Sequence, residues 1–311
     1  MSSQTPAYNS RFIYILMFFV AFFWGLAWPV GRILATDLLS YPYSVMFFRY
    51  LFAIPVLFGW LWFKEGNVVP LKRDYSYLLL LAFTSVFLYQ FGYMFGMQKT
   101  AASDASLIIG FNPVSVSLLS VFVLSHSLTR NGMLGIFLSF SGVLLIFLAS
   151  PNVDINFSDR LIGNAYIMFG AFAYAIYVVA MRRYVLVVRE DPLSSLATIS
   201  WTSLIGCLMF VPFVINESPW NRVWENEEWA LIAYLGVLST ALCYVFFAMG
   251  VETIGANKAA SFINVVPIFG ILSSWLWIGE ELGLVQIVSF ILIYYGVKLV
   301  NQQPSESLRN D

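Results

Sequence analysis

The sequence predicts an all-α membrane protein whose ten transmembrane helices form two inverted five-helix repeats. Three observations support this fold class: the composition, ten long apolar segments, and an internal repeat. Apolar residues occupy 60% of the 311 positions and charged residues only 11%, with a mean hydropathy of +0.79. A soluble domain is about half apolar and about a quarter charged. The composition therefore indicates a protein that crosses the bilayer many times.

Ten segments are long and apolar enough to span a membrane, which requires about 20 mostly apolar residues. The first apolar run, from Phe12, is too long for the apolar region of a signal peptide, so we expect it to be a retained helix. The expected spans are residues 12–35, 43–63, 75–97, 101–124, 131–149, 162–184, 193–215, 229–250, 256–278 and 282–301.

The chain also matches itself at a constant offset of 154 residues. The stretch KTAASDASLIIGFNP at 99–113 is repeated as TIGANKAASFINVVP at 253–267, and the same offset pairs Gly142 with Gly296. Such self-similarity is the mark of an internal repeat. We therefore predict one repeat over 1–149, a second over 150–301, and a disordered polar tail over 302–311. A proline interrupts each copy of the matched helix.

The distribution of basic residues predicts the orientation. Ten spans put both termini on one side, and the positive-inside rule selects the cytoplasm. With the N-terminus inside, eleven of the 16 Lys and Arg residues fall in inner segments. The other five are Arg32, Lys99, Arg160 and Arg222 in outer segments, and Arg49 within a span. We expect a multi-pass protein of the cytoplasmic (inner) membrane. Because five spans is an odd number, the second repeat enters with opposite polarity, an arrangement typical of transporters with a site near the midplane.

Several segments resemble a known family. The first and second spans carry FFWGLAWPVGRIL (22–34) and MFFRYLFAIP (46–55), and the third runs into GMQKTAASDASLIIGFNP. The fifth carries GIFLSFSGVLLI (135–146), and the second half repeats the last two as GVETIGANKAASFINVVP and VSFILIYYGVKLV. This ordered set is similar to the EamA family of the drug/metabolite transporter (DMT) superfamily. The resemblance implies a ten-helix inner-membrane carrier, often an exporter of amino acids or other small metabolites.

Aromatic residues in mid-span are candidates for a substrate site. Trp24 and Trp28 share one helix face, and an indole N–H inside the membrane needs a partner. Tyrosine and glutamine side chains are likewise costly in hydrocarbon unless they are bonded. Each residue could line a cavity or pack between helices. The polar candidates are Tyr89, Gln90 and Tyr93 in the third span, Tyr174 and Tyr177 in the sixth, and Tyr244 in the eighth, which the repeat pairs with Gln90.

Two asparagines and one arginine complete the candidate substrate-binding set. Asn112 and Asn264 lie near the helix-breaking prolines and could bond a freed backbone carbonyl or a substrate. Arg49 is the only basic residue deep in a span, where insertion costs about 2.5–3.5 kcal/mol. Snorkelling to the outer edge or a structural bond ranks ahead of anion binding for Arg49.

The sequence also lacks several kinds of group. We find no Asp or Glu in the middle of any span, whereas carriers driven by protons or sodium usually place one there. We therefore expect a secondary transporter, an exporter or facilitator, that works by alternating access without obligatory proton coupling. A neutral or zwitterionic cargo fits this set of residues. The single histidine, His126, provides no metal cluster, and Cys207 and Cys243 provide no disulfide framework.

Other functions remain as alternatives. A nucleotide-sugar or phosphometabolite antiporter would need a strongly basic pocket. An intramembrane enzyme or lipid-handling protein would need a reactive polar cluster, and we find no catalytic set, cofactor motif or phosphate-binding loop. A non-transporting structural subunit would exclude solvent along the repeat axis. The net charge of −1 gives no case for nucleic acid. The expected partners are a small-molecule substrate and the lipid bilayer, for a monomer or weak homodimer.

Overall fold

The computed structural model describes residues 9–124, 129–152, 154–187 and 192–302. All regular structure in these ranges is helical, and ten helical segments have the length and apolarity of membrane spans. The first half consists of α1 (Ser10–Asp37), α2 (Pro42–Glu65), a third span built from α3 (Tyr75–Ala82), η1 (Phe83–Leu88) and α4 (Tyr89–Met97), a fourth built from α5 (Ala102–Ile109) and α6 (Asn112–Leu124), and α7 (Arg130–Ala149).

The second half follows the same plan. It consists of α8 (Phe157–Val187), α9 (Ser195–Glu217), the short η2 (Pro219–Asn221), an eighth span built from α10 (Asn226–Ala233), η3 (Tyr234–Leu242) and α11 (Cys243–Ile254), a ninth built from α12 (Ala256–Ile263) and α13 (Val266–Ile278), and α14 (Leu284–Asn301). The ten predicted spans are thus confirmed, and some are longer than expected: the predicted span 162–184 is the 31-residue helix α8. His126 and the predicted tail beyond Gln302 lie outside the described residues.

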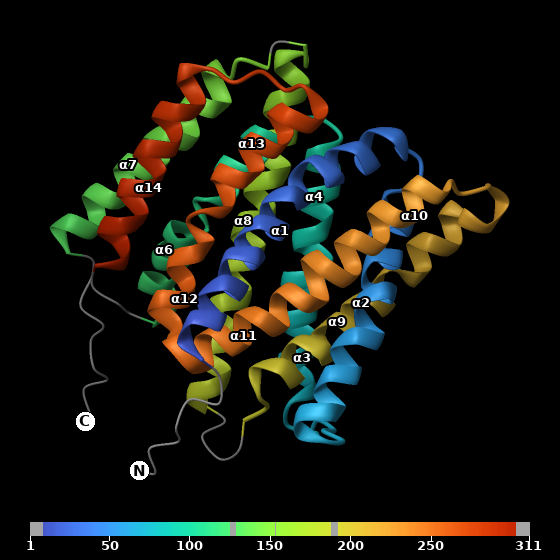
Figure 1. Ribbon diagram of the computed structural model, residues 1–311. Coiled ribbons are helices and arrows are strands. Elements are labelled where there is room, and N and C mark those ends of the chain that lie inside the picture. The colour runs from blue at the N-terminus through green and yellow to red at the C-terminus, as the bar shows by residue number, and fades with distance from the viewer. Residues whose placement is uncertain (1–8, 125–128, 153, 188–191, 303–311) are drawn as a thin grey trace.

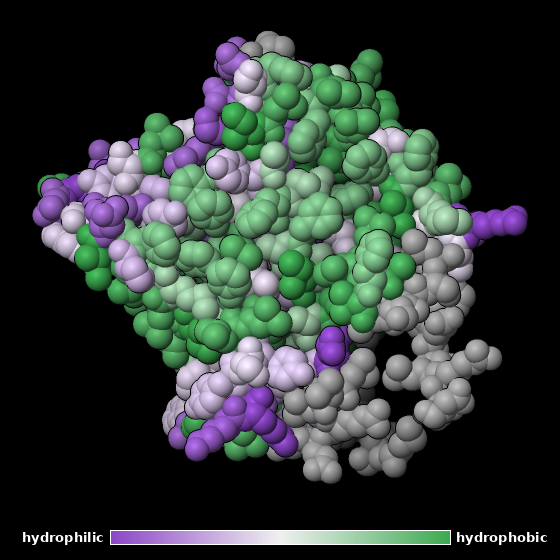
Figure 2. All heavy atoms as spheres, turned by 180° about the vertical axis from the view of Figure 1, so that it is seen from behind, coloured by the Kyte–Doolittle hydropathy of each residue, from purple (hydrophilic) through white to green (hydrophobic). Residues whose placement is uncertain are grey.

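The two ends of the described chain share one side of the bundle. The first turn of α1 and the last turn of α14 lie at the lower left of Figure 1. We call this the chain-end side and the opposite side the far side. An apolar band crosses the middle of the surface in Figure 2, with hydrophilic residues gathered at its margins. Side chains such as Phe137 and Leu276, which are 66% and 73% exposed, face outward from the bundle, as expected for a surface in contact with lipid.

The helix contacts follow the repeat. α1 packs against α13 and α11 of the other half, and its counterpart α8 packs against α6 and α4 of the first half. The two second spans, α2 and α9, pack on each other, as do the two fifth spans, α7 and α14. Helices of each half therefore pack against helices of the other half. This is the contact pattern expected of two repeats related by a pseudo-two-fold axis.

Small residues set the closest contacts between these helices. A Cβ at Gly92 of α4 would lie 2.5 Å from the Tyr166 carbonyl oxygen of α8. A Cβ at Gly142 of α7 would lie 2.8 Å from the Ser289 carbonyl oxygen of α14. Lipid tails are as apolar as these helix surfaces, so close van der Waals contact rather than the hydrophobic effect holds such pairs together.

Two kinds of interruption recur in both halves. The fourth and ninth spans break at Gly110–Phe111 and at Asn264–Val265, in each case just before the repeated prolines. The third and eighth spans each contain a π-helical segment, η1 and η3. In η3, the Thr240 hydroxyl donates to the Leu235 carbonyl oxygen at 2.8 Å, five residues back. π segments inside α-helices are frequent at functional sites.

Candidate functional site

A cavity of about 900 Å³ lies between the two halves. Its inner end is formed by side chains from α1, α2, α4 and η3, including Trp28, Arg49 and Ser239. Its other end reaches Thr129, at the start of α7, and Asn301, at the end of α14. Because these last residues are at the chain-end side, the cavity runs from the middle of the bundle to that side. Its size is typical of a small-molecule site.

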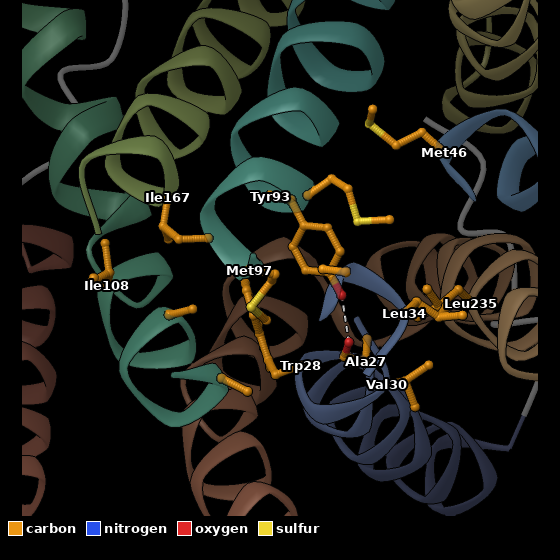
Figure 3. Packing of buried hydrophobic residues seen from close by; sticks show 14 of the residues in the cluster. Ala27, Trp28, Val30, Leu34, Met46, Tyr93, Met97, Ile108, Ile167 and Leu235 are labelled. Carbon is orange, nitrogen blue, oxygen red and sulfur yellow. Dashed lines mark hydrogen bonds between the residues drawn. The ribbon is translucent and has the colours of Figure 1, made fainter. Parts of the chain in front are cut away.

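On the far side, an apolar cluster closes the bundle. Figure 3 shows Leu34, Met46, Met97 and Leu235 of this cluster, which come from α1, α2, α4 and η3. Each of these four side chains is less than 2% exposed. These four side chains lie in the parts of their spans that are nearer the far surface, and none of them is in the cavity lining.

Tyr93 fixes α4 to α1 at the boundary between this cluster and the cavity. Its hydroxyl donates to the Ala27 carbonyl oxygen at 2.5 Å, as the dashed line in Figure 3 shows, and its ring contacts Trp28 with centroids 5.4 Å apart. A Cβ at Gly31 would overlap the Tyr93 hydroxyl. Glycine at this position therefore lets Tyr93 reach the backbone of α1.

A carboxylate from the second half caps a helix of the first half at the far surface. Glu280, just after α13, accepts hydrogen bonds from the backbone N–H groups of Ala102 (2.6 Å) and Ser103 (2.8 Å) and from the Ser103 hydroxyl (2.5 Å). We call this contact the Glu280 cap. The sequence predicts Ser103–Asp104 as a local N-cap, and this is wrong: α5 begins at Ala102, has no local side-chain cap, and receives its capping group from the other repeat.

A similar pair of contacts ties α2 to α9 at both ends. At the far surface Glu217 accepts from the backbone N–H groups of Tyr43 (2.9 Å) and Ser44 (2.7 Å) and from the Ser44 hydroxyl (2.6 Å). At the chain-end surface the Ser194 hydroxyl donates to Glu65 at 2.8 Å. Unlike the Glu280 cap, the α2–α9 contact is therefore bonded on both faces, and α9 contributes no described side chain to the cavity lining.

Aromatic side chains form the wall of the cavity. The Trp24 indole N–H donates to the Ser239 carbonyl oxygen at 2.8 Å, and its ring meets Tyr244 edge-on at 5.8 Å. Tyr89 meets Tyr174 with ring centroids 5.8 Å apart. Tyr177 contacts Tyr174 at 5.5 Å but is not itself in the lining.

Arg49 points into the bundle and is half-buried. Its Nε donates to the Thr240 hydroxyl at 3.0 Å and its Nη1 to Gln90 Oε1 at 3.3 Å, and the Gln90 amide in turn donates to the Tyr50 hydroxyl at 3.2 Å. The guanidinium also lies over the Tyr93 ring, 5.6 Å from its centroid. Snorkelling to the outer edge, one interpretation of Arg49 from the sequence, is therefore wrong.

Three buried polar atoms of lining residues have no hydrogen-bond partner among the described residues: Trp28 Nε1, Asn112 Oδ1 and Ser239 Oγ. An unpaired buried polar group costs about 1–3 kcal/mol, so a bound solute or water beside these atoms would be stabilising. Asn112 begins α6 and Asn264 directly follows α12, which puts both amides at the breaks in the fourth and ninth spans.

The structure brings ten of the eleven candidate residues to one cavity: Trp24, Trp28, Arg49, Tyr89, Gln90, Tyr93, Asn112, Tyr174, Tyr244 and Asn264. Reasoning from sequence missed several polar lining residues, among them Tyr50, Ser239 and Arg182. Tyr50 directly follows Arg49, and a polar aromatic beside an intramembrane arginine was a usable signal. Ser239 lies in the π segment η3, and no local pattern marks its side as facing the cavity.

Comparison with known proteins identifies the family. The model described as "EamA-like transporter family" matches residues 11–148 and 161–302. This chain belongs to the EamA-like transporter family. The family lies in the DMT superfamily, so the resemblance read from the sequence motifs is confirmed.

Relatives of this EamA-like chain bear transporter names. It is 25% identical to a protein named "Uncharacterized transporter" from Archaeoglobus fulgidus over 83% of this chain and 87% of the relative. It is 27% identical to the "Uncharacterized transporter YyaM" of Bacillus subtilis over 82% and 83%. A solved crystal structure at 16% identity aligns over 93% of this chain and 96% of that one with a TM-score of 0.62, which shows a shared fold.

The geometry of this EamA-like transporter fits a membrane carrier of small molecules. No group of three or more His, Cys, Asp or Glu side chains that could hold a metal occurs in the described ranges. The described lining combines aromatic rings, amides and hydroxyls with two arginines and contains no carboxylate. Such a surface can stack on a solute and hydrogen-bond it.

Proposed function

We propose that this chain is a secondary carrier that moves a small organic metabolite, an amino acid or a related compound, across the cytoplasmic membrane by alternating access. The observation that carries the proposal is a cavity of about 900 Å³ between the repeats that extends to the chain-end side and ends at an apolar cluster toward the far side. A structural subunit has no need of such a hollow, and a channel would have to be continuous across the bundle.

The cargo binds between Trp24 and Tyr244 on one side and Tyr89 and Tyr174 on the other. Aromatic rings offer flat contact area at low entropy cost, and tyrosine hydroxyls offer hydrogen bonds at their tips. By the positive-inside rule the chain-end side is cytoplasmic, so this conformation receives cargo from the cytoplasm. Closure of that side and opening of the far side then release it.

Transport proceeds without obligatory proton coupling. The described lining contains no Asp, Glu or His that could carry a proton across. The cargo gradient, or exchange for a second solute, drives the flux.

Proteoliposome flux tests the proposal. Purified protein should take up radiolabelled amino acids or related solutes faster than protein-free vesicles. Tyr244→Ala and Asn112→Ala should each lower the initial rate about tenfold, the scale of a lost hydrogen bond or ring contact in a binding site. Phe137→Ala, on the outward face of α7, is the matched control and should transport normally. Normal flux in both cavity variants, with folding verified by melting temperature, would place the cargo elsewhere.

A further inference from the structure

Arg49 carries a charge for which the described residues offer no counter-ion. No carboxylate among them lies within 4.0 Å of its guanidinium; the ion pairs of the described chain involve Lys64, Arg73, Lys99 and Arg222. Its Nε and Nη1 donate to neutral oxygens, of Thr240 and Gln90. The Tyr93 side chain, which also contacts the guanidinium, is a neutral group as well. A guanidinium bonded only to neutral groups retains its attraction for an anion.

The charge balance of the cavity favours the same kind of ligand. The charged side chains in its described lining are Arg49, at the inner end, and Arg182, near the end of α8. Both are positive, and no described lining residue is acidic. A site that is net positive and partly shielded from water attracts a small anion and repels a cation.

The two neutral acceptors of Arg49, Thr240 and Gln90, lie in or near the π segments of their spans. Thr240 lies within the π segment η3, and Gln90 is the second residue after the π segment η1. A Cβ at Gly236 of η3 would overlap the Arg49 carbonyl oxygen, so glycine at this position brings η3 against α2. The backbones of the third and eighth spans thus hold the acceptors around one guanidinium at the end of the cavity. The Gln90 bond is long, at 3.3 Å, and a carboxylate would form a shorter, charge-assisted bond.

We infer that Arg49 binds a carboxylate group of the transported solute and so restricts the cargo to carboxylic acids and zwitterions. This inference rests on the proposed function and narrows it. The carboxylate accepts from Nη2 and displaces Gln90 from Nη1, while the remainder of the solute lies against Trp24 and Tyr89. An ammonium group on the same solute faces tyrosine and indole rings, which attract cations. One guanidinium matches a singly charged, planar group.

Pairs of solutes that differ only at the acid test this inference. The probes are L-phenylalanine with L-phenylalaninamide, L-leucine with L-leucinamide, and L-methionine with L-methioninamide, each added to purified wild-type protein in a thermal-shift titration. A solute that binds only folded protein raises the melting temperature. At least one acid should stabilise the protein, with its amide about ten- to hundredfold weaker, the scale of a lost charge-assisted hydrogen bond.

Variants separate a binding role from a structural one. Arg49→Gln should lose the preference for the acid. Gln90→Glu places a carboxylate within reach of Arg49 and should lose the preference with the arginine intact, which keeps the test valid if Arg49→Gln fails to fold. Lys72→Gln removes an exposed charge outside the spans and should keep the preference.

The outcomes are distinct. An amide that binds as well as its acid, an unaltered preference in Gln90→Glu, or the absence of stabilisation by any acid would overturn the assignment. If proteoliposomes then carry amides or other neutral solutes, the carrier function stands and only the Arg49 role falls. If they carry no solute at all, both proposals fall together.

Discussion

Replacement of Glu280 by glutamine should open the far side of the bundle. The carboxylate accepts three hydrogen bonds from Ala102 and Ser103 at the start of α5, all at 2.8 Å or shorter. In glutamine, one of the two accepting oxygens is replaced by an NH₂ group, which would face the N–H and O–H donors of Ala102 and Ser103. The substitution also removes a negative charge from the N-terminus of α5, where such a charge is stabilising. Hydrogen bonds to charged groups contribute about 1.5–3 kcal/mol each, so the loss of one shifts the closed-to-open ratio on the order of ten- to hundredfold.

Thiol labelling from the far side measures this shift. A cysteine at Ile108, fully buried on α5, is placed in a background in which Cys207 and Cys243 are replaced by alanine. A membrane-impermeant maleimide should modify this cysteine at least about ten times faster in Glu280→Gln than with Glu280 intact. The labelling rate rises because a larger fraction of the protein is open to the far side.

Glu217→Gln provides the matched control. It removes an equivalent cap from the same surface, where Glu217 accepts from Tyr43 and Ser44. Because α2 and α9 remain bonded at the other end and α9 contributes no described side chain to the cavity lining, this variant should lower the melting temperature and leave the labelling rate unchanged. Equal rates in Glu280→Gln and its parent, or the same acceleration in Glu217→Gln, would refute a gating role for the Glu280 cap.

Three further predictions follow from individual contacts. Gly31→Ala should lower the free energy of unfolding by about 1–3 kcal/mol in a detergent melt, because its Cβ would displace the Tyr93 hydroxyl from Ala27; an unchanged melting temperature would contradict this. Trp24→Phe keeps a ring but loses the 2.8 Å bond to the Ser239 carbonyl oxygen, and should weaken cargo binding about tenfold with little change in maximal flux; unaltered affinity would assign the indole to packing alone. A protonophore should leave the initial uptake rate in proteoliposomes within about twofold of its untreated value, because the described lining has no carboxylate, and collapse of uptake would indicate proton coupling.

The sequence was sufficient for the order of spans because hydropathy and length decide them. It also located the breaks in the fourth and ninth spans, because the repeated prolines each stand in the first turn of a new helix, α6 or α13. A proline alone was not sufficient, since Pro29, Pro55 and Pro212 lie inside continuous helices. The mid-span aromatics were found for a similar reason: Trp24 and Tyr244 occur where neither lipid nor the interface suits a polar ring. Their meeting in one cavity depends on the pairing of α1 with α11, which the repeat suggests and tertiary packing determines.

The features that escaped prediction depend on contacts between distant residues. Glu280 caps a helix that begins 178 residues earlier, and local sequence pointed to Ser103–Asp104 instead. The π segments have no simple sequence pattern, and η3 includes Gly236, which packs closely against α2 of the other half. The depth of Arg49 in its span did not predict that its side chain points into the bundle. That orientation depends on a hydrogen bond to Thr240 in the eighth span.

Counterflow in proteoliposomes tests alternating access most directly. Vesicles preloaded with an excess of unlabelled cargo should take up trace labelled cargo to a transient level above equilibrium, because a carrier that opens to one face at a time returns loaded and exchanges one solute for another. Uptake that rises only to equilibrium, with no overshoot at any preloading concentration, would show a continuous pathway or no carrier and would contradict a cavity that alternates between the two faces.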